Sequence, residues 1–370
     1  MSSATIMAIG YSVLFLILIC ALVIPFWIYQ RREKSAVKWF KDFRYNEDLA
    51  NRFVSDYKLP ISITNDEKIF IYQLHLYENS FGSLTKWNEL WQMIDKKYEG
   101  NCHAFLDDYY QIRERIIQET LNNPAYQEFN NMDMSQFNVP KTNISKKNIY
   151  NGENEGKFFL SIDLKKANFQ ALRYVSPKIV KNAETYEDFI GTFTDLDYVK
   201  TSKYTRQVVF GKLNPSRHIT VEKFLIDKVL ECLRSSQLYN QYTGYSNIVS
   251  LSNDEIIIKI NSFEEGESLN DMWAYIMEKT GIRVHTEVFM LKGYQLLSVG
   301  NDHTCVTFYR KCHQDSTQDK LMCVPGSYHT VIWKLFTGRQ IDRLDRYVNY
   351  DKATLCMFTE DFELKPLKGE

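Results

Sequence analysis

Apolar residues recur three and four positions apart over the first third of the chain, which is the spacing of one face of an α-helix. The clearest examples are SAVKWFKDFRYNEDLANRFV, SLTKWNELWQMIDKKY and CHAFLDDYYQIRERIIQETL. These patterns predict a small helical domain over residues 31–121. Residues 122–156 are rich in Asn, Ser, Lys and Gly and have little periodicity, so we expect a linker there.

Short apolar runs alternate with helical patterns after residue 157. KFFLSIDL and RQVVFGKL each predict a strand, and ITVEKFLIDKVLECLRSS predicts a long amphipathic helix. NIVSLSNDEIIIKIN predicts a hairpin, because two apolar runs flank the polar pair Asn253-Asp254. SLNDMWAYIMEKTG then predicts a helix, and EVFMLKGYQLLSVG predicts a strand. This order predicts an α+β fold over 157–300, with helices on one face of a sheet, and a hairpin and helix extension over 301–370.

The most apolar segment lies near the start of the chain, where TIMAIGYSVLFLILICALVIPFWIYQ contains no charged residue. At 1.5 Å per residue, a helix from Ile6 to Ile28 would be roughly 35 Å long, enough to cross a bilayer. Basic residues follow this run and none precedes it, so the positive-inside rule places the rest of the chain in the cytosol. We therefore expect residues 1–30 to be the transmembrane anchor of a single-pass membrane protein, with a cleaved signal peptide as the alternative.

Charge and cysteine content narrow the partners that the chain can have. The 45 Lys and Arg residues balance 46 Asp and Glu residues, so any contact with nucleic acid must come from a local patch. The seven cysteines are expected to be free thiols in a reducing cytosol. The spacing of the later cysteines and histidines fits no paired zinc arrangement, so no zinc site is expected from His303, Cys305, Cys312, His313 and Cys323.

Two acidic positions stand at the tips of apolar strands: Asp163, and the pair Asp254-Glu255 in the hairpin turn. If the two strands are neighbours in a sheet, their carboxylates converge and need a divalent cation to offset their repulsion. Mg²⁺ is the natural candidate, and two such ions on adjacent strands support in-line phosphoryl transfer. The alternatives are structural: Asp163 can cap the following helix, and Asp254 is a favoured turn residue.

Four stretches in this half of the chain resemble motifs of reverse transcriptases. SIDLKKANFQAL resembles motif A, in which a catalytic Asp ends a strand, and FGKLNPSRHITVEKFLIDKVLECL resembles motif B. IVSLSNDEIIIKI resembles motif C and EVFMLKGYQLL resembles motif E, and all four stand in the order of that family. Motif C here reads Ser-Asn-Asp-Glu, which is closer to family A DNA polymerases, and RQVVFG also resembles a pattern of that family. The resemblance implies a palm-like antiparallel sheet over 157–300.

The resemblance also implies roles for individual residues. Asp163, Asp254 and Glu255 would be catalytic, and Asp163 and Asp254 would bind Mg²⁺. The position that would select the sugar is Asn168. The residues expected to bind nucleotide are Lys165, Lys166, Asn168, Phe169, Arg206 and Lys212. For the lysines and the arginine, a solvated surface is the alternative.

Two hypotheses of function follow. The first is a membrane-anchored palm-domain enzyme that transfers nucleotidyl groups with two metal ions and contacts nucleotide or nucleic acid. The second is a non-catalytic, membrane-anchored interaction or scaffold protein with a degenerate palm-like fold. Protein partners would bind through the helical domain in either case.

Overall fold

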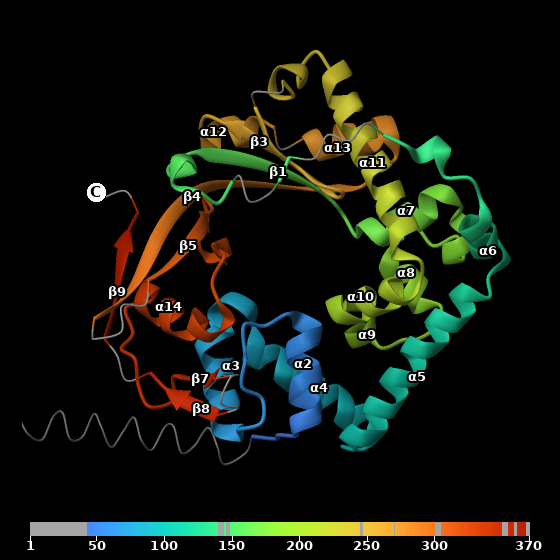
Figure 1. The fold of residues 1–370 in the computed structure, drawn as a ribbon. Helices are drawn as coiled ribbons and strands as arrows, with labels where there is room; N and C mark the ends of the chain where they lie inside the picture. Colours follow the sequence, from blue (N-terminus) through green and yellow to red (C-terminus); the bar gives the residue numbers. More distant parts are fainter. Residues whose placement is uncertain are drawn as a thin grey trace, which may run out of the picture.

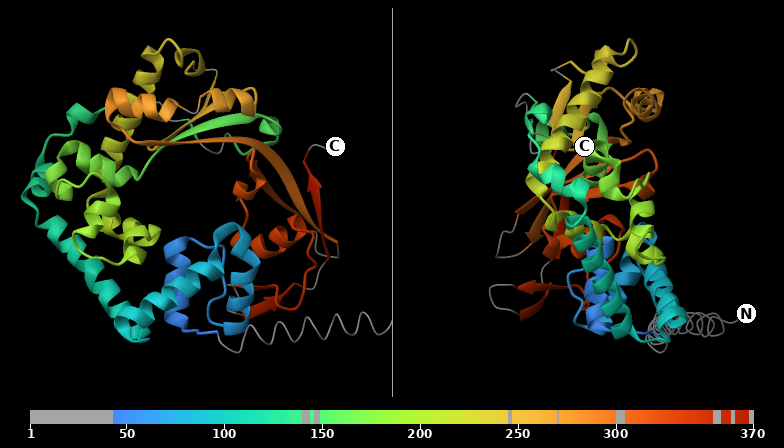
Figure 2. Two further views of the ribbon diagram at one scale, coloured as in Figure 1. Left: turned by 180° about the vertical axis from the view of Figure 1, so that it is seen from behind. Right: turned by 90° about the vertical axis from the view of Figure 1, so that its right-hand side faces the viewer.

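The computed structural model describes residues 43–139, 144–145, 149–244, 247–269, 271–299, 305–349, 354–358 and 361–367. Their helices and strands are arranged in a ring, which has the same outline from the front and from behind (Figures 1 and 2). The first helices form one side of this ring, a second group of helices forms the next, and an antiparallel sheet forms the rest (Figure 1).

The first side of the ring consists of four helices whose apolar faces carry the spacing seen in the sequence. They are α2 (Glu47–Tyr57), α3 (Glu67–Phe81), α4 (Ser83–Tyr98) and α5 (Cys102–Leu121). Trp87 is fully buried between them and meets Phe53 and Phe70 edge to face, with ring centroids 5.1 and 4.9 Å apart. Helix α6 (Pro124–Asn131) follows within the stretch expected to be a linker, and its Tyr126 is buried.

The second group of helices includes one segment that the sequence pattern assigned to a strand. The helices are α7 (Ala167–Val175), α8 (Tyr186–Gly191), α9 (Asp197–Thr201), α10 (Lys203–Lys212) and α11 (Pro215–Ser235). The prediction of a strand for RQVVFGKL was wrong, because this stretch belongs to α10. The Ser202 side chain caps the helix by accepting a hydrogen bond from the Thr205 backbone, and Thr205, Val209 and Phe210 form its buried face.

The sheet has seven antiparallel strands in the order β2-β3-β1-β4-β5-β6, with β9 also paired to β4. They are β1 (Phe158–Leu164), β2 (Ile248–Leu251), β3 (Glu255–Ile260), β4 (Val284–Val299), β5 (Cys305–Cys312), β6 (Lys320–Met322) and β9 (Asp361–Pro366). A separate pair is formed by β7 (Arg346–Asn349) and β8 (Thr354–Met357). The described chain is therefore of the expected α+β class.

Helices cover one face of the strands β1 and β3. Leu160 and Ile162 of β1, with Ile256 and Ile258 of β3, belong to one core cluster with the buried residues of α7 and α11. Helices α12 (Phe263–Ser268) and α13 (Met272–Thr280) lie along the same side (Figure 1). Alternate residues of the strands point to the other face, so polar side chains on that face are directed towards the inside of the ring.

None of the described helices is long and apolar enough to cross a membrane. The two longest, α5 and α11, carry charged residues along their length and bury only one face. This finding contradicts the expectation of a single-pass membrane protein with a transmembrane helix and its bulk in the cytosol. The run from Ile6 to Ile28, on which that expectation was based, lies outside the described residues.

Asp56 of α2 is a buried carboxylate that joins the two groups of helices. Its side chain is 1% exposed and accepts hydrogen bonds from the hydroxyls of Tyr109 (2.8 Å), Tyr198 (2.7 Å) and Ser202 (2.7 Å). Arg52 adds an ion pair, with Nε 3.2 Å from the carboxylate. Since a buried charge is costly unless it is paired and hydrogen-bonded, these contacts fix α9 and the start of α10 against α2 and α5.

A second buried charge closes the ring. Lys334 of α14 (His329–Phe336) is buried and donates to Asp345 (2.5 Å), which is fully buried and also accepts from the Tyr72 hydroxyl of α3 (2.8 Å). The hydroxyl oxygen of Tyr77 in α3 lies 3.0 Å from the Nδ1 atom of His329. The last part of the chain is therefore bound to the first group of helices as well as to the sheet.

We expect Asp56→Ala to destabilise the protein by roughly 3–5 kcal/mol, because it leaves Arg52 buried without its partner. Urea denaturation of the full chain measures this change. Asp48→Ala is the matched control, since Asp48 is an exposed acid on the same helix, and it should cost less than about 1 kcal/mol. A loss below 1 kcal/mol for Asp56→Ala would show that the cluster does not support the fold.

Candidate functional site

Two of the three predicted catalytic acids lie opposite each other where β1 ends and β3 begins. We call this pair, Asp163 and Glu255, the strand-edge acids. Asp163, near the end of β1, is the register partner of Glu255, the first residue of β3. Directly opposed residues of an antiparallel pair share a face, with Cβ atoms roughly 4.5–5.5 Å apart. Glu255 is buried, and its Oε1 atom accepts a hydrogen bond from Ser161 Oγ (2.6 Å). The two carboxylates therefore stand side by side on the face of β1 and β3 that the helices leave uncovered.

Asp254 lies one position earlier and has different surroundings. Its backbone carbonyl accepts a hydrogen bond from Leu164 N (2.7 Å), which fixes the hairpin turn to the end of β1. Its side chain accepts from Ser252 Oγ (3.0 Å). The negative charge of Asp254 acts on Glu222 of α11, which lies under the helical face of the sheet. In this register the partner of Asp163 is Glu255, whereas the sequence analysis paired Asp163 with Asp254.

Glu222 is a buried acid that the sequence analysis did not select. Its side chain accepts a hydrogen bond from Asn168 of α7. Burial raises the pKa of Glu222 to about 7, with a further rise from Asp254, while the hydrogen bond from Asn168 opposes the shift. A signal was present in the sequence, because Glu222 precedes Leu225 and Ile226 by three and four positions and so falls on the buried face of α11.

Helix α10 brings two of its cations near the strand-edge acids. Burial lowers the pKa of Arg206, and the charges of Tyr186 and Asp163 oppose this shift. Burial and the positive charge of Arg206 lower the pKa of Lys203, and Asp163 again opposes the shift. Asp163 is therefore the carboxylate whose field reaches both cations. Lys203 was not among the predicted nucleotide-binding residues, because it precedes the stretch from Arg206 to Leu213 in which Arg206 and Lys212 were selected.

The other predicted nucleotide-binding residues are dispersed. Lys212 is exposed at the far end of α10, about 9 Å along the helix axis from Arg206 at 1.5 Å per residue. Phe169 is buried and packs on Tyr186 of α8, so its ring belongs to the core. Lys165 is exposed and Lys166 forms an ion pair with Glu187. Of the predicted residues, Asn168 contacts the acid Glu222 and Arg206 is within the field of Asp163.

A groove of about 1,200 Å³ runs along the inner side of the ring, lined by residues of α3, α10, α12, α14, the sheet and the segment after α2. It is bordered by Lys203 on one side and by His285, the β4 neighbour of Asp163, on another. Aromatic side chains of Phe81, Phe263 and Trp333 also line it. Asp163 and Glu255 are not among the described residues that line the groove, so His285 is its link to the end of β1.

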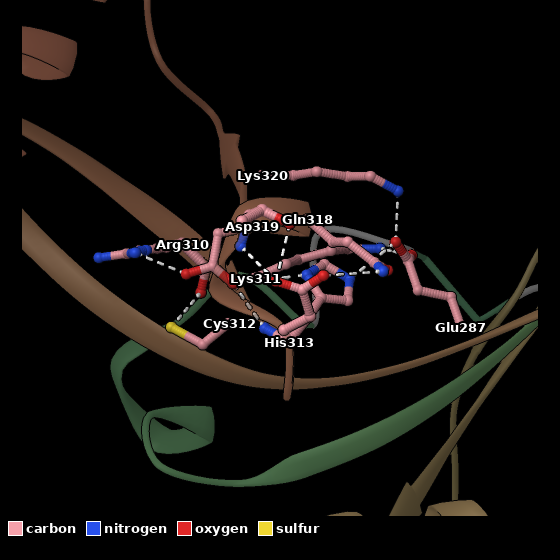
Figure 3. Close-up of polar contacts among 10 residues, drawn as sticks. Glu287, Arg310, Lys311, Cys312, His313, Gln318, Asp319 and Lys320 are labelled. Carbon is pink, nitrogen blue, oxygen red and sulfur yellow. Dashed lines mark hydrogen bonds and ion pairs between the residues drawn. The ribbon is translucent and has the colours of Figure 1, made fainter. Parts of the chain in front are cut away.

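A cluster of buried charges forms one wall of this groove (Figure 3). Glu287 of β4 accepts hydrogen bonds from Lys311 (2.9 Å) and Lys320, and lies 3.0 Å from His313 Nε2. Burial alone would raise the pKa of Glu287, but the hydrogen bonds and positive charges of its neighbours hold it well below the usual range. Asp319 accepts from the His313 backbone (2.7 Å) on the other side of the imidazole. Arg310 pairs with Asp319 as well (2.6 Å), and these contacts hold β4, β5 and β6 together.

Within the ranges that the structure describes, no group of three or more His, Cys, Asp and Glu side chains is placed to hold a metal. Asp163 and Glu255 form a pair of carboxylates, which is enough for Mg²⁺ when substrate phosphates complete its coordination. No protein-family model, curated protein or solved structure matches the chain.

We expect the stability of the protein to depend on Glu222 and to fall as the pH rises from about 4.5 to about 7. Over this interval the folded protein keeps a proton that the unfolded chain has lost, so ionisation costs up to about 3 kcal/mol in the folded state. Glu222→Gln removes this cost, so its stability relative to wild type should increase between pH 5 and pH 8 in urea denaturation.

Glu231→Gln is the matched control, because Glu231 is exposed on the same helix. Its effect on the free energy of unfolding should be the same at both pH values. If Glu222→Gln also gives the same difference at pH 5 and pH 8, Glu222 does not ionise in this interval and the account of its environment is wrong.

Proposed function

We propose that this protein binds a nucleoside triphosphate and catalyses nucleotidyl transfer at the Asp163–Glu255 edge of the sheet. The observation that carries the proposal is the register of Asp163 with Glu255 on neighbouring strands. Lys203 and Arg206 of α10 lie within the field of Asp163 and would supply positive charge for the phosphates. The motif order that resembles reverse transcriptases supports the same reaction, since it places acids at the ends of these two strands.

Each group near the edge has a role in this proposal. Asp163 and Glu255 would hold Mg²⁺, which supplies neutralisation of phosphate charge and a lower pKa for an attacking hydroxyl. Ser161 fixes the Glu255 carboxylate by its hydrogen bond of 2.6 Å. Lys203 and Arg206 bind the phosphates, because charge-assisted hydrogen bonds from these cations are strong. Lys203 and His285 also line the groove, so a bound triphosphate would lie at its border.

Asn168 orients the sugar in this proposal. Its amide nitrogen donates to the buried Glu222, so its carbonyl oxygen is directed to accept a hydrogen bond from a sugar hydroxyl. The position is also the one that the resemblance to reverse transcriptases assigns to sugar selection. Glu222 is therefore a positioning residue, which acts on the substrate through Asn168.

A non-catalytic interaction protein built on the same sheet is the second candidate. The observation that favours it is the internal compensation of the acids: Ser161 already donates to Glu255, and Lys203 and Arg206 offset the charge of Asp163. In such a protein these groups would balance one another's charge and serve the fold alone. Protein partners would then bind elsewhere, with the helices α2–α5 as the proposed surface.

The enzyme proposal predicts binding of nucleoside triphosphates that depends on Mg²⁺. A mixture of ribonucleoside and deoxyribonucleoside triphosphates with Mg²⁺ should raise the melting temperature of the full chain, because a ligand that binds the folded state stabilises it. Asp163→Asn should abolish the part of this rise in melting temperature that depends on Mg²⁺. Arg206→Gln should weaken binding by about tenfold or more, measured by titration calorimetry, since it removes a charge-assisted hydrogen bond.

Lys212→Gln is the matched control on α10, and its affinity should stay within about twofold of wild type because a distant exposed charge contributes little. A wild-type protein whose melting is indifferent to triphosphates and to Mg²⁺ contradicts the enzyme proposal. If Asp163→Asn is also tolerated in folding, the interaction protein is the function that remains.

A further inference from the structure

A second cavity, of about 240 Å³, lies beside α7 and the turn that follows Asp163. It is lined by residues of α7, the start of α8 and the segment Gly281–Arg283. Asp163, Glu255 and the residues of α10 are not among the described residues that line it. Its volume is just below the roughly 300–1,000 Å³ of typical ligand pockets, so it suits a small ligand and not a polymer.

One side chain holds the wall of this cavity in place. Gln170 of α7 donates from Nε2 to the backbone carbonyls of Arg283 (2.6 Å) and Lys165 (2.7 Å). Its Oε1 atom accepts from Arg283 N (2.8 Å). Because both ends of the amide are used, the segment before β4 and the turn before α7 are fixed relative to each other. The cavity is therefore formed before any ligand binds.

The charges around the cavity leave an excess of positive charge. Arg173 and Arg283 share the carboxylate of Glu184, and Lys166 pairs with Glu187. Four cations and two acids line the cavity, which gives an excess of two positive charges: Lys165, Lys166, Arg173 and Arg283 against Glu184 and Glu187. This excess matches a phosphate monoester, which carries a charge of about −1.5 to −2 at neutral pH.

Lys166 is a half-buried cation of this cavity. Burial, with the positive charges of Arg206 and Lys165, lowers the pKa of Lys166 to about 8. Glu187 and the ring of Tyr186, both of α8, are its other neighbours, with the ring centroid 5.0 Å from Nζ. An anion in the cavity would favour the charged form of Lys166 and so raise its pKa.

Aromatic side chains complete the lining. Tyr174 of α7 is 43% exposed at the cavity, and its ring packs on Phe224 with centroids 5.8 Å apart. Leu225 of α11 and Ile282 add apolar surface. An exposed aromatic ring beside cations provides a stacking surface for a planar ring that carries a negative group.

We propose that this cavity binds a small phosphate monoester with a planar ring, of which a nucleoside monophosphate is the simplest representative. The phosphate would lie among Lys165, Lys166 and Arg283, and the ring would stack on Tyr174. The site is separate from the proposed reaction site and does not depend on nucleotidyl transfer. It gives the protein a position at which such a ligand binds next to the turn that follows Asp163.

Titration calorimetry on the full chain tests this proposal with AMP as the probe, and with adenosine and inorganic phosphate as partial ligands. We expect AMP to bind at least tenfold more tightly than either partial ligand. Arg283→Gln should weaken AMP binding about tenfold or more, by loss of a charged hydrogen bond. Tyr174→Leu should weaken it about fivefold to a hundredfold, by loss of stacking.

Two controls separate this site from the reaction site. Lys181→Gln removes one positive charge at a nearby exposed position, paired with Glu119, and should leave AMP binding unchanged. Arg206→Gln should likewise leave most of the AMP affinity, although it weakens triphosphate binding. Conversely, Arg283→Gln should leave triphosphate binding in the presence of Mg²⁺ unchanged.

The pH dependence gives an independent measurement. AMP affinity should fall between pH 7 and pH 9, because Lys166, whose Nζ would contact the phosphate, loses its proton in this interval. No AMP binding at millimolar concentration, or AMP binding that neither Arg283→Gln nor Tyr174→Leu weakens, overturns the proposal. Loss of AMP binding in Arg206→Gln alone assigns AMP to the reaction site and also overturns it.

Discussion

The buried carboxylate of Asp56 is the interaction on which the arrangement of the second group of helices depends. A carboxylate inside a protein needs a cation and several hydrogen-bond donors, and here the donors come from α5, α9 and the residue before α10. Moving α10 away would leave the charge partly unsatisfied. Lys203 and Arg206 are on that helix. The contacts of Asp56 therefore also position the two cations on which Asp163 acts.

The sheet supplies the other half of the candidate site by its register. β1 lies between β3 and β4, so the position of Asp163 has a neighbour on each side, Glu255 and His285. The helices α7 and α11 pack on one face of these strands, and the opposite face carries both the acids near the strand ends and a second apolar cluster that includes Phe159, Ile257 and Phe289. The same packing buries Glu222 among apolar neighbours, and its burial is the reason that an ordinary glutamate has a pKa of about 7.

The two proposed ligand sites are connected by a short piece of chain. Asp163 is the last residue but one of β1, and Lys165 and Lys166 form the turn after it. Helix α7 follows, and its Asn168 contacts Glu222 while its Tyr174 lines the cavity. Gln170 holds that turn to the segment before β4. A ligand that moves this turn would also move Asp163, because the two are joined by the backbone. Arg206 is near both, since its charge lowers the pKa of Lys166 and the charge of Asp163 acts on Arg206.

The sequence by itself determined the α+β class, the helices of the first third and the strands that carry Asp163 and Glu255. Local spacing decides these features, because apolar periodicity is a property of each segment alone. Only the tertiary structure decided that RQVVFGKL is helical, since its β-branched residues fit a strand until Ser202 and the contacts of Asp56 hold it as α10. The register that pairs Asp163 with Glu255 likewise depends on segments far apart in the sequence, as does the cavity beside α7. No local pattern encodes these distances, whereas the burial of Glu222 follows the apolar spacing of α11.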